Sequence, residues 1–210
     1  MPQVRKPEVE RHIHEAALLR FAQDGIQQTS MAAIAATAGV SAGNLYRYHP
    51  DGKQALLNSV LPRELAERFD RLVTDRVRAL PLGADGTIGP SPEADELLSF
   101  WIAHRLEVVI LLTRATGTRY AGFPERFEQL LVDLGVERLE HAGVTPTADD
   151  RVLLSIVMAN TRVALAQILL RFDDARRIRR AIEGFWSYQL PGLNGLHDWL
   201  RTTSGSQASP

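Results

Sequence analysis

Residues 29–48 read TSMAAIAATAGVSAGNLYRY, and this segment sets the architecture of the amino-terminal part of the chain. It predicts two short helices, each preceded by a serine. A serine at this position caps a helix because its hydroxyl accepts a hydrogen bond from a free backbone N–H. Ser30 and Ser41 therefore mark the two helix starts. Between the helices, Gly39 supplies the unusual dihedral of a sharp turn, and Val40 closes the corner.

Two short helices joined by a tight glycine-containing turn form a helix-turn-helix, whose second helix enters the major groove of DNA. Leu45 is predicted to face the core, and its neighbours on the second helix point outward. Asn44 and Arg47 suit the edges of adenine and guanine respectively. The residues predicted to contact DNA are Ser30, Ser41, Ala42, Gly43, Asn44, Tyr46, Arg47, Tyr48, His49 and Lys53. For the aromatic residues an alternative stays open, since Tyr46 and Tyr48 can pack between helices and His49 can be a solvated turn residue.

The same residues resemble the N-terminal domain of TetR-family repressors. The matching string is G-x₃-TS-x₃-IA-x₂-AGVS-x-G-x-LY-x-Y, which runs from Gly25 to Tyr48 and is followed by Lys53 and Leu56. The resemblance implies a homodimer, most often a repressor, that releases a palindromic operator when a small molecule enters the C-terminal domain. The family usually has Tyr-Phe-x-x-Lys after the recognition helix. This chain has YHPDGK at 48–53, one residue longer, which bears on whether Lys53 reaches a phosphate.

Outward from this segment, the pattern predicts an all-α fold, with a helix-turn-helix DNA-binding domain followed by a helical effector-binding and dimerisation domain. The expected domains are 1–55 and 56–201, with a disordered tail at 202–210. The expected helices are 8–24, 31–38, 42–48, 53–80, 93–117, 124–142, 147–171 and one that starts at 173. Pro62 is predicted to kink or divide the fourth helix, and Pro191 to end the last. The segment 81–92, rich in Gly and Pro, is predicted to be a linker.

Composition places the chain among ordinary soluble proteins. It has 210 residues, 45% of them hydrophobic, a net charge of −1 and no cysteine. The absence of cysteine excludes disulfides and cysteine nucleophiles. We expect a cytoplasmic protein with neither a secretory signal nor a transmembrane helix. Because the net charge is close to zero, affinity for DNA must come from where the charges are placed.

The segment 147–171 is apolar nearly all round, so both of its faces should be covered. A two-fold-related copy of the chain is the simplest partner for the outer face. The residues predicted at this dimer interface are Leu153, Val157, Ala164, Ile168, Ile178, Ile182, Phe185 and Trp186. A monomer with a thick core is the alternative.

A ligand pocket is predicted mainly on the helix 93–117 and the segment after it, where aromatic, basic and hydroxyl side chains recur at helical intervals. Such a mixture suits an apolar body with a few orienting polar groups. The predicted lining is Trp101, His104, Arg105, Val108, Leu112, Thr116, Tyr120, Phe123 and Asn160. The alternative is that Trp101 and Phe123 are plain core residues.

Catalytic and metal-binding functions find little support in the sequence. None of the six histidines has the spacing of a paired metal site, and no phosphate-binding loop or nucleophile motif is present. We therefore predict no enzyme, no metal site and no cofactor. The expected partners are operator DNA, a second copy of the chain and a small-molecule effector, without a membrane. A DNA-binding regulator or adaptor that lacks an effector is the alternative, and a cavity between residues 93 and 171 would argue against it.

Overall fold

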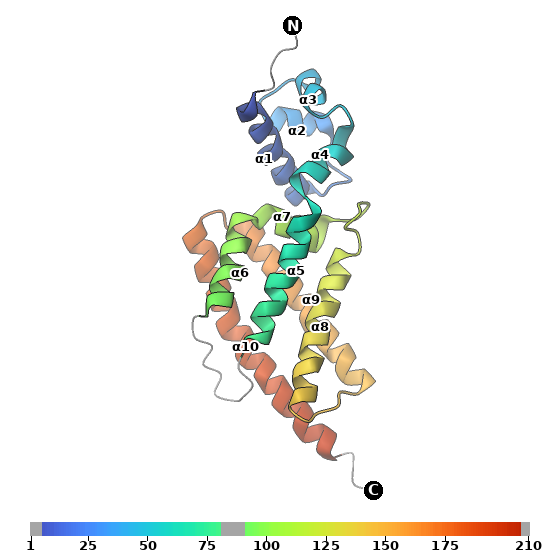
Figure 1. The fold of residues 1–210 in the computed structure, drawn as a ribbon, viewed down its shortest axis with the longest axis vertical. Helices are drawn as coiled ribbons and strands as arrows, with labels where there is room; N and C mark the ends of the chain where they lie inside the picture. The colour runs from blue at the N-terminus through green and yellow to red at the C-terminus, as the bar shows by residue number, and fades with distance from the viewer. Residues whose placement is uncertain (1–5, 81–90, 207–210) are drawn as a thin grey trace.

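The structure is a computed structural model that describes residues 6–80 and 91–206, with side chains to residue 202. Every regular element in these ranges is a helix (Figure 1). The elements are α1 (Pro7–Asp24), α2 (Met31–Thr37), α3 (Ala42–Tyr48), α4 (Gly52–Val60), α5 (Arg63–Arg78), α6 (Pro92–Ala103), α7 (Arg105–Val109), the π-helix η1 (Ile110–Arg114), α8 (Phe123–His141), α9 (Ala148–Arg171) and α10 (Ala175–Ser206). The all-α prediction is confirmed.

Helices α1 to α4 form a small head at one end of the molecule, and α5 to α10 form an elongated body beneath it (Figure 1). In the head, Ser30 accepts a hydrogen bond from the N–H of Ala33 at 3.1 Å, and Ser41 accepts one from the N–H of Asn44 at 3.1 Å. Gly39 has a φ of 68°, as the predicted turn requires. The core of the head is built around Ile13, Phe21, Ile34 and Leu45, which are fully buried.

Pro62 divides the predicted fourth helix into α4 and α5, because a proline removes one backbone donor and suits the residue just before a helix. Helix α5 then runs down the body from the head. Its buried face includes Phe69, Leu72, Val73 and Arg76, at offsets 0, 3, 4 and 7. Phe69 is at the centre of an aromatic cluster, with Phe100, Phe123 and Phe127 stacked at ring-centroid distances of 6.0, 5.7 and 5.3 Å. The apolar core is therefore continuous from the head into the body.

Pro191 does not end the last helix as predicted, because α10 continues through it to Ser206. The proline is exposed, so water can hydrate the carbonyl that loses its partner. Leu193, Leu196 and Leu200 beyond it pack on a second apolar cluster that includes Leu139 and Leu154. Burial of these side chains offsets the lost hydrogen bond. The helix thus extends into the predicted tail at 202–210, of which residues 207–210 lie outside the described part, as do 81–90 of the predicted linker.

Helix α9 is long and apolar enough to cross a membrane by length and composition alone. In this fold it packs against α7, α8, α10 and η1. Arg162, near its middle, is in an ion pair with Glu128 of α8 and donates to the carbonyl of Leu112 at 2.7 Å. These polar contacts are those of a core helix, one face of which stays uncovered.

Candidate DNA-binding surface and body cavity

The outer face of α3 carries the exposed part of the predicted DNA-binding set. Tyr46 has 49% of its surface exposed, and Arg47 is also exposed. The guanidinium of Arg47 donates to Oδ1 of Asn44 at 2.9 Å, so these two base-reading candidates lie side by side. A side chain added at Gly43 would meet nothing within 4 Å, which leaves the backbone of α3 open to close approach. Ser30, Ser41 and Ala42 are exposed on the same head.

Tyr48 and His49 turn inward, unlike the other predicted contacts. Their exposed fractions are 4% and 8%. The hydroxyl of Tyr48 accepts a hydrogen bond from the backbone N–H of Lys6 at 2.9 Å, which ties the start of α1 to the end of α3. His49 ends α3, and its ring lies 5.4 Å from that of His14 on α1. Both side chains support the recognition helix from behind.

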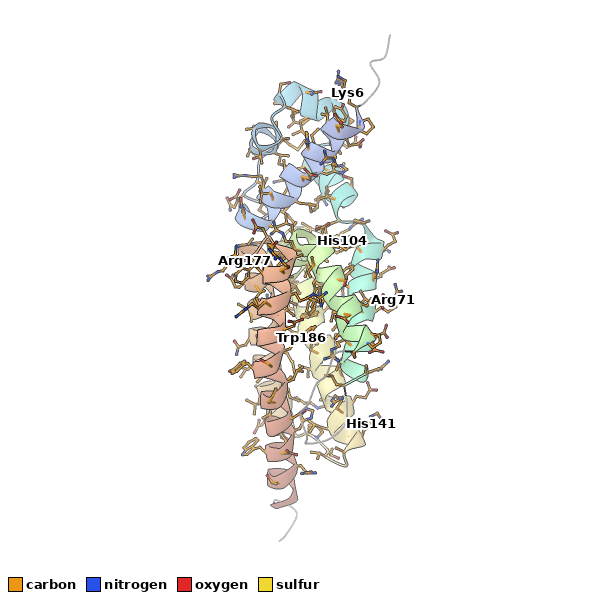
Figure 2. All side chains as sticks on the ribbon, turned by 90° about the vertical axis from the view of Figure 1, so that its left-hand side faces the viewer. Lys6, Arg71, His104, His141, Arg177 and Trp186 are labelled. Carbon is orange, nitrogen blue, oxygen red and sulfur yellow. The ribbon has the colours of Figure 1, made fainter. Side chains whose placement is uncertain are left out.

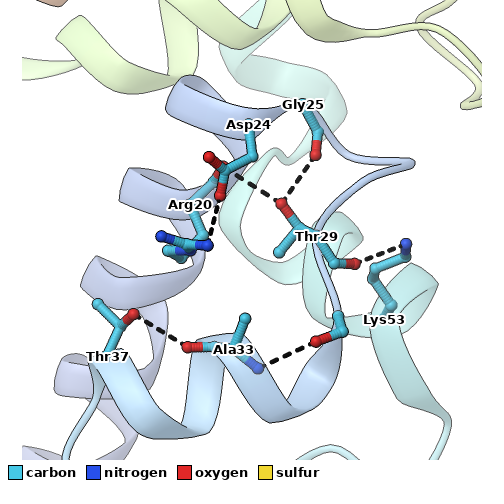
Figure 3. A network of polar contacts seen from close by, with 8 residues as sticks. Arg20, Asp24, Gly25, Thr29, Ala33, Thr37 and Lys53 are labelled. Atoms are coloured by element: carbon cyan, nitrogen blue, oxygen red, sulfur yellow. Dashed lines mark hydrogen bonds and ion pairs between the residues drawn. The ribbon is translucent and has the colours of Figure 1, made fainter.

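Lys53 occupies a structural position rather than a surface one. Its ammonium group donates to the carbonyls of Ile26 at 2.7 Å and Gln27 at 3.2 Å. It also donates to the carbonyl of Thr29 at 2.8 Å (Figure 3). An ammonium group has three donors, so all of them are directed at the loop between α1 and α2. Thr29 closes the same loop by donating to the carbonyl of Gly25 at 2.7 Å. In this structure Lys53 therefore supports the helix-turn-helix, and its contact with a phosphate stays a prediction.

The head is joined to the body through Leu61, which links α4 to α5 and is fully buried. Its carbonyl accepts hydrogen bonds from the hydroxyl of Tyr120 at 2.8 Å and from Arg119 at 2.9 Å. Close by, Arg114 at the end of η1 donates to the carbonyl of Ala22 on α1 at 3.3 Å. The α4–α5 joint is thus held by the segment that follows η1. Tyr120, which was predicted to line a pocket, belongs to this joint.

The body contains a cavity of about 130 Å³. Side chains of α5, α6, α8, α9 and α10 line it. Its apolar wall includes Trp101, Phe127, Met158, Phe185 and Trp186, and the rings of the two tryptophans lie 5.9 Å apart. Its polar wall consists of Arg76, Arg138, Thr161, Gln189, Asn194 and His197.

Only Trp101 of the predicted ligand-binding residues lines this cavity. Val108, Leu112 and Phe123 are buried in the core, and Thr116 and Asn160 are exposed. Arg105 donates to the carbonyl of Leu169 at 3.2 Å, and His104 lies 3.4 Å from Glu107. Most predicted residues lie between α6 and the start of α8, whereas α5, α8, α9 and α10 supply most of the cavity wall. Helix α10 reaches it because this helix continues past Pro191.

Two signals in the sequence mark the polar wall that the prediction missed. Arg76 follows Phe69, Leu72 and Val73 at the spacing of a buried helical face, and Arg138 follows Leu131 and Gly135 in the same way. A charged residue in register with a core-facing row is the unusual observation. Burial lowers the pKa of both guanidinium groups. Burial, and then the charge of Arg138, also lower the pKa of His197.

The predicted dimer residues divide into two groups. Ile178 and Ile182 are buried within their own chain, and Phe185 and Trp186 line the cavity. Leu153, Val157, Ala164 and Ile168 on α9 are half-buried. Next to them the structure exposes large apolar side chains that the prediction omitted, namely Val152, Ile156 and Val163 on α9 and Tyr188 and Trp199 on α10. This ridge is the uncovered face of α9 together with one side of α10.

Among the described residues, one group has the composition of a metal site. Glu10, His14 and His49 have potential ligand atoms within 4.8 Å of one another. His14 also lies 3.3 Å from the hydroxyl of Ser59. The residues come from both ends of the head sequence, so spacing along the chain does not reveal them. We report the grouping as geometry and assign no metal to it.

Comparison with known proteins agrees with this architecture. Residues 13–60 match the family model described as bacterial regulatory proteins, tetR family. The crystal structure of AibR in complex with isovaleryl coenzyme A and operator DNA has a similar fold, with a TM-score of 0.50, 20% identity, and coverage of 87% of this chain and 98% of that chain. The MbdR regulator from Azoarcus sp. CIB gives a TM-score of 0.48 at 20% identity, over 90% and 96% of the chains. A putative transcriptional regulator from Pseudomonas aeruginosa PAO1 gives 0.44 at 21%, over 93% and 96%. A search of curated proteins found no match.

The exposed recognition helix, the helical body and the matched segment together define a helix-turn-helix transcriptional regulator. The matched segment, 13–60, spans the head from within α1 to the end of α4. Residues 13–60, the head of the chain, match the tetR family of bacterial regulatory proteins.

Proposed function

We propose that this chain is a ligand-responsive repressor that binds a palindromic operator in the cytoplasm as a homodimer. The observation that carries the DNA-binding part is the exposed face of α3, with Tyr46 and the Arg47–Asn44 pair on it. Arg47 and Asn44 are assigned to base edges, Tyr46 to a phosphate, and Gly43 to close backbone approach. Ser30, Ser41 and Ala42 complete this surface. Tyr48, His49 and Lys53 hold it in position.

The dimer is proposed to form through the apolar ridge on α9 and α10. Ile156 is 56% exposed and Tyr188 79% exposed, which is unusual for side chains of this size on adjoining helices. A two-fold axis through the ridge would cover it with its own copy. Two heads are also required to read half-sites about 34 Å apart. Leu153 and Val157 on α9 are assigned to the margin of this interface.

An effector is favoured over the alternative without one because the body contains a cavity with mixed apolar and polar walls. Helix α5 lines the cavity with Val73 and Arg76 and leads directly to the joint at Leu61. We propose that a bound effector displaces α5 and changes the separation of the two heads. For this to release DNA, the effector must bind the released state more tightly. AibR, a protein of similar fold, has been crystallised with both kinds of partner, isovaleryl coenzyme A and operator DNA, which supports the proposal.

The test is a selection of bound fragments from genomic DNA, followed by gel shifts with variants. Tyr46→Ala is expected to weaken operator binding about tenfold or more while the protein stays dimeric by size-exclusion chromatography. Gln129→Ala, an exposed change on α8 of the body, is the matched control and should bind as the parent does. Arg47→Ala should relax the selected sequence. Full affinity of the Tyr46→Ala variant would refute the assignment of α3.

A further inference from the structure

The polar wall of the body cavity has an uneven charge balance. Arg76 and Arg138 both line it, and none of its described lining residues is acidic. Arg76 has only 6% of its surface exposed. A guanidinium stays charged in a protein, so its burial without a carboxylate costs free energy that other contacts must offset.

The contacts of Arg76 within the chain are weak for a buried charge. One nitrogen lies 3.4 Å from the hydroxyl of Ser91, and the group lies 5.5 Å from the ring centroid of Trp186. Among the described residues, no carboxylate lies within 4.0 Å of it. The charge of Glu93, which is at the surface, acts on Arg76 but does not outweigh burial, so the pKa of Arg76 is lowered. Among the described residues, this buried cation at the cavity wall thus has no close counter-ion.

A second donor on the wall also lacks an acceptor. Trp101 is 5% exposed, and its indole N–H is buried with no hydrogen-bond partner among the described residues. Indole nitrogen is a donor only, so it requires an oxygen or similar acceptor. Arg76 and Trp101 come from different helices, α5 and α6, and both line the same cavity. The cavity therefore presents donors and positive charge where a ligand would lie.

Besides the polar side chains of Thr161, Gln189, Asn194 and His197, the rest of the wall is apolar and aromatic, with Trp101, Phe127, Leu165 and Trp186 among its residues. A site that holds one water needs about 10–15 Å³, so a cavity of about 130 Å³ is well above that threshold. This cavity suits a small organic ligand with an apolar body. Figure 2 shows Trp186 on the inner part of the body, whereas Arg71 on α5 points away from it.

We propose that the cavity binds an organic anion with an apolar body, a carboxylate whose charged end is held by Arg76 and Arg138. The apolar part lies against Trp101 and Trp186, and the carboxylate supplies acceptors for Arg76 and for the indole N–H of Trp101. A carboxylate paired with a guanidinium makes charge-assisted hydrogen bonds, which are the stronger kind. This inference rests on the proposed function, because it names the class of effector for the cavity assigned there.

Three ligands with the same eight-carbon chain test the proposal: octanoate, octanol and octylammonium. Binding is followed by tryptophan fluorescence, to which Trp101 and Trp186 at the cavity contribute beside the exposed Trp199, and is checked by calorimetry. We expect octanoate to bind at least tenfold more tightly than octanol, and octylammonium more weakly than either. Equal affinity for octanoate and octanol, or no binding of octanoate, would overturn the proposal.

Variants locate the charge that selects the ligand. Arg76→Met should weaken octanoate binding at least tenfold and leave octanol binding within threefold. Arg71→Met, an exposed change on the same helix, is the matched control and should have no effect. Arg138→Met, on a different helix, makes the same test if Arg76→Met fails to fold. Unchanged octanoate affinity in the folded arginine variants would overturn the proposal.

Gel shifts on the same protein separate this inference from the proposed function. Release of the operator by neutral compounds but not by octanoate would refute the anion-binding site and would still support the proposed repressor function. Arginine-dependent binding of octanoate to a protein that selects no palindromic DNA would support the anion site and refute the repressor.

Discussion

Lys53 offers the sharpest test of how the head is built, because a phosphate contact and a structural support predict opposite results. Replacement by Met keeps most of the side-chain length and removes the ammonium group. In the structure this removes three hydrogen bonds, at 2.7, 2.8 and 3.2 Å, to carbonyls of the α1–α2 loop. The loop carbonyls of Ile26 and Thr29 then lose a charged donor.

The expected loss of folding stability is modest because Lys53 is half-buried, so water can replace part of the lost hydrogen bonding. A hydrogen bond from a charged group contributes about 1.5–3 kcal/mol, and solvent exposure reduces this. We therefore expect a loss of about 2 kcal/mol over the three bonds. For a chain of this size, that corresponds to a fall in Tm of about 4–8 °C.

Two measurements on the Lys53→Met variant distinguish the roles. Thermal unfolding followed by circular dichroism should show the lower Tm. The slope of log Kd against log salt concentration should equal that of the parent, because no phosphate contact is lost. A true phosphate contact would change this slope by about 0.9 for each head, with no change in Tm. That second pattern would refute the structural assignment.

Three further predictions concern the joint, the dimer and the histidines. Tyr120→Phe removes the 2.8 Å hydrogen bond to the carbonyl of Leu61 and should weaken the coupling between effector and operator, while effector affinity in the absence of DNA stays within threefold. Gel shifts with and without effector measure this coupling. Unchanged release of the operator would contradict the role of the joint. Ile156→Glu places a charge on the exposed ridge and should weaken the dimer by about 3 kcal/mol or more. Light scattering measures the dimer, with Gln129→Glu as the control. A variant that stays dimeric at the same concentration as the parent would contradict the interface. Burial lowers the pKa of His14 although Glu10 raises it in part, and His49 and Ser59 are its other neighbours. Since the unfolded chain then binds the proton more tightly, the stability is full above about pH 6.5 and is lost as the pH falls toward the lower pKa of the folded state. In urea unfolding, His14→Gln should reduce the difference in the free energy of unfolding between pH 7.5 and pH 5.0. An unchanged difference would exclude His14 as its source.

Local chemistry makes much of the fold predictable from the sequence. The caps at Ser30 and Ser41, the turn at Gly39 and the division at Pro62 each depend on the properties of one residue and its near neighbours. Such features are decided within a few residues, so they can be inferred without knowing the tertiary structure. For the same reason the exposure of Tyr46 and Arg47 on α3 agrees with the prediction.

The sequence-based predictions differ from the structure where segments distant in the chain come into contact. Local rules predict a helix end at Pro191, but leucines beyond it pack on α8 and α9, and no local rule reveals that burial. They also predict a surface role for Lys53, because the carbonyls that it binds belong to a loop more than twenty residues earlier in the chain. The prediction shares only Trp101 with the cavity, because the walls of the cavity come from five helices that only the tertiary structure brings together. Arg76 and Arg138 could have been found, since each is a charge on an otherwise apolar face.

The distance between Arg76 and Leu61 constrains how a ligand can act on DNA. Arg76 lies thirteen residues after Arg63, the first residue of α5, so at 1.5 Å per residue about 20 Å of helix separates it from the joint. A ligand at Arg76 therefore makes no direct contact with the joint. We expect its influence to pass through movement of α5. The two hydrogen bonds at Leu61 contribute only about 1 kcal/mol each, so a ligand that binds the displaced state a hundredfold more tightly supplies enough free energy to break them.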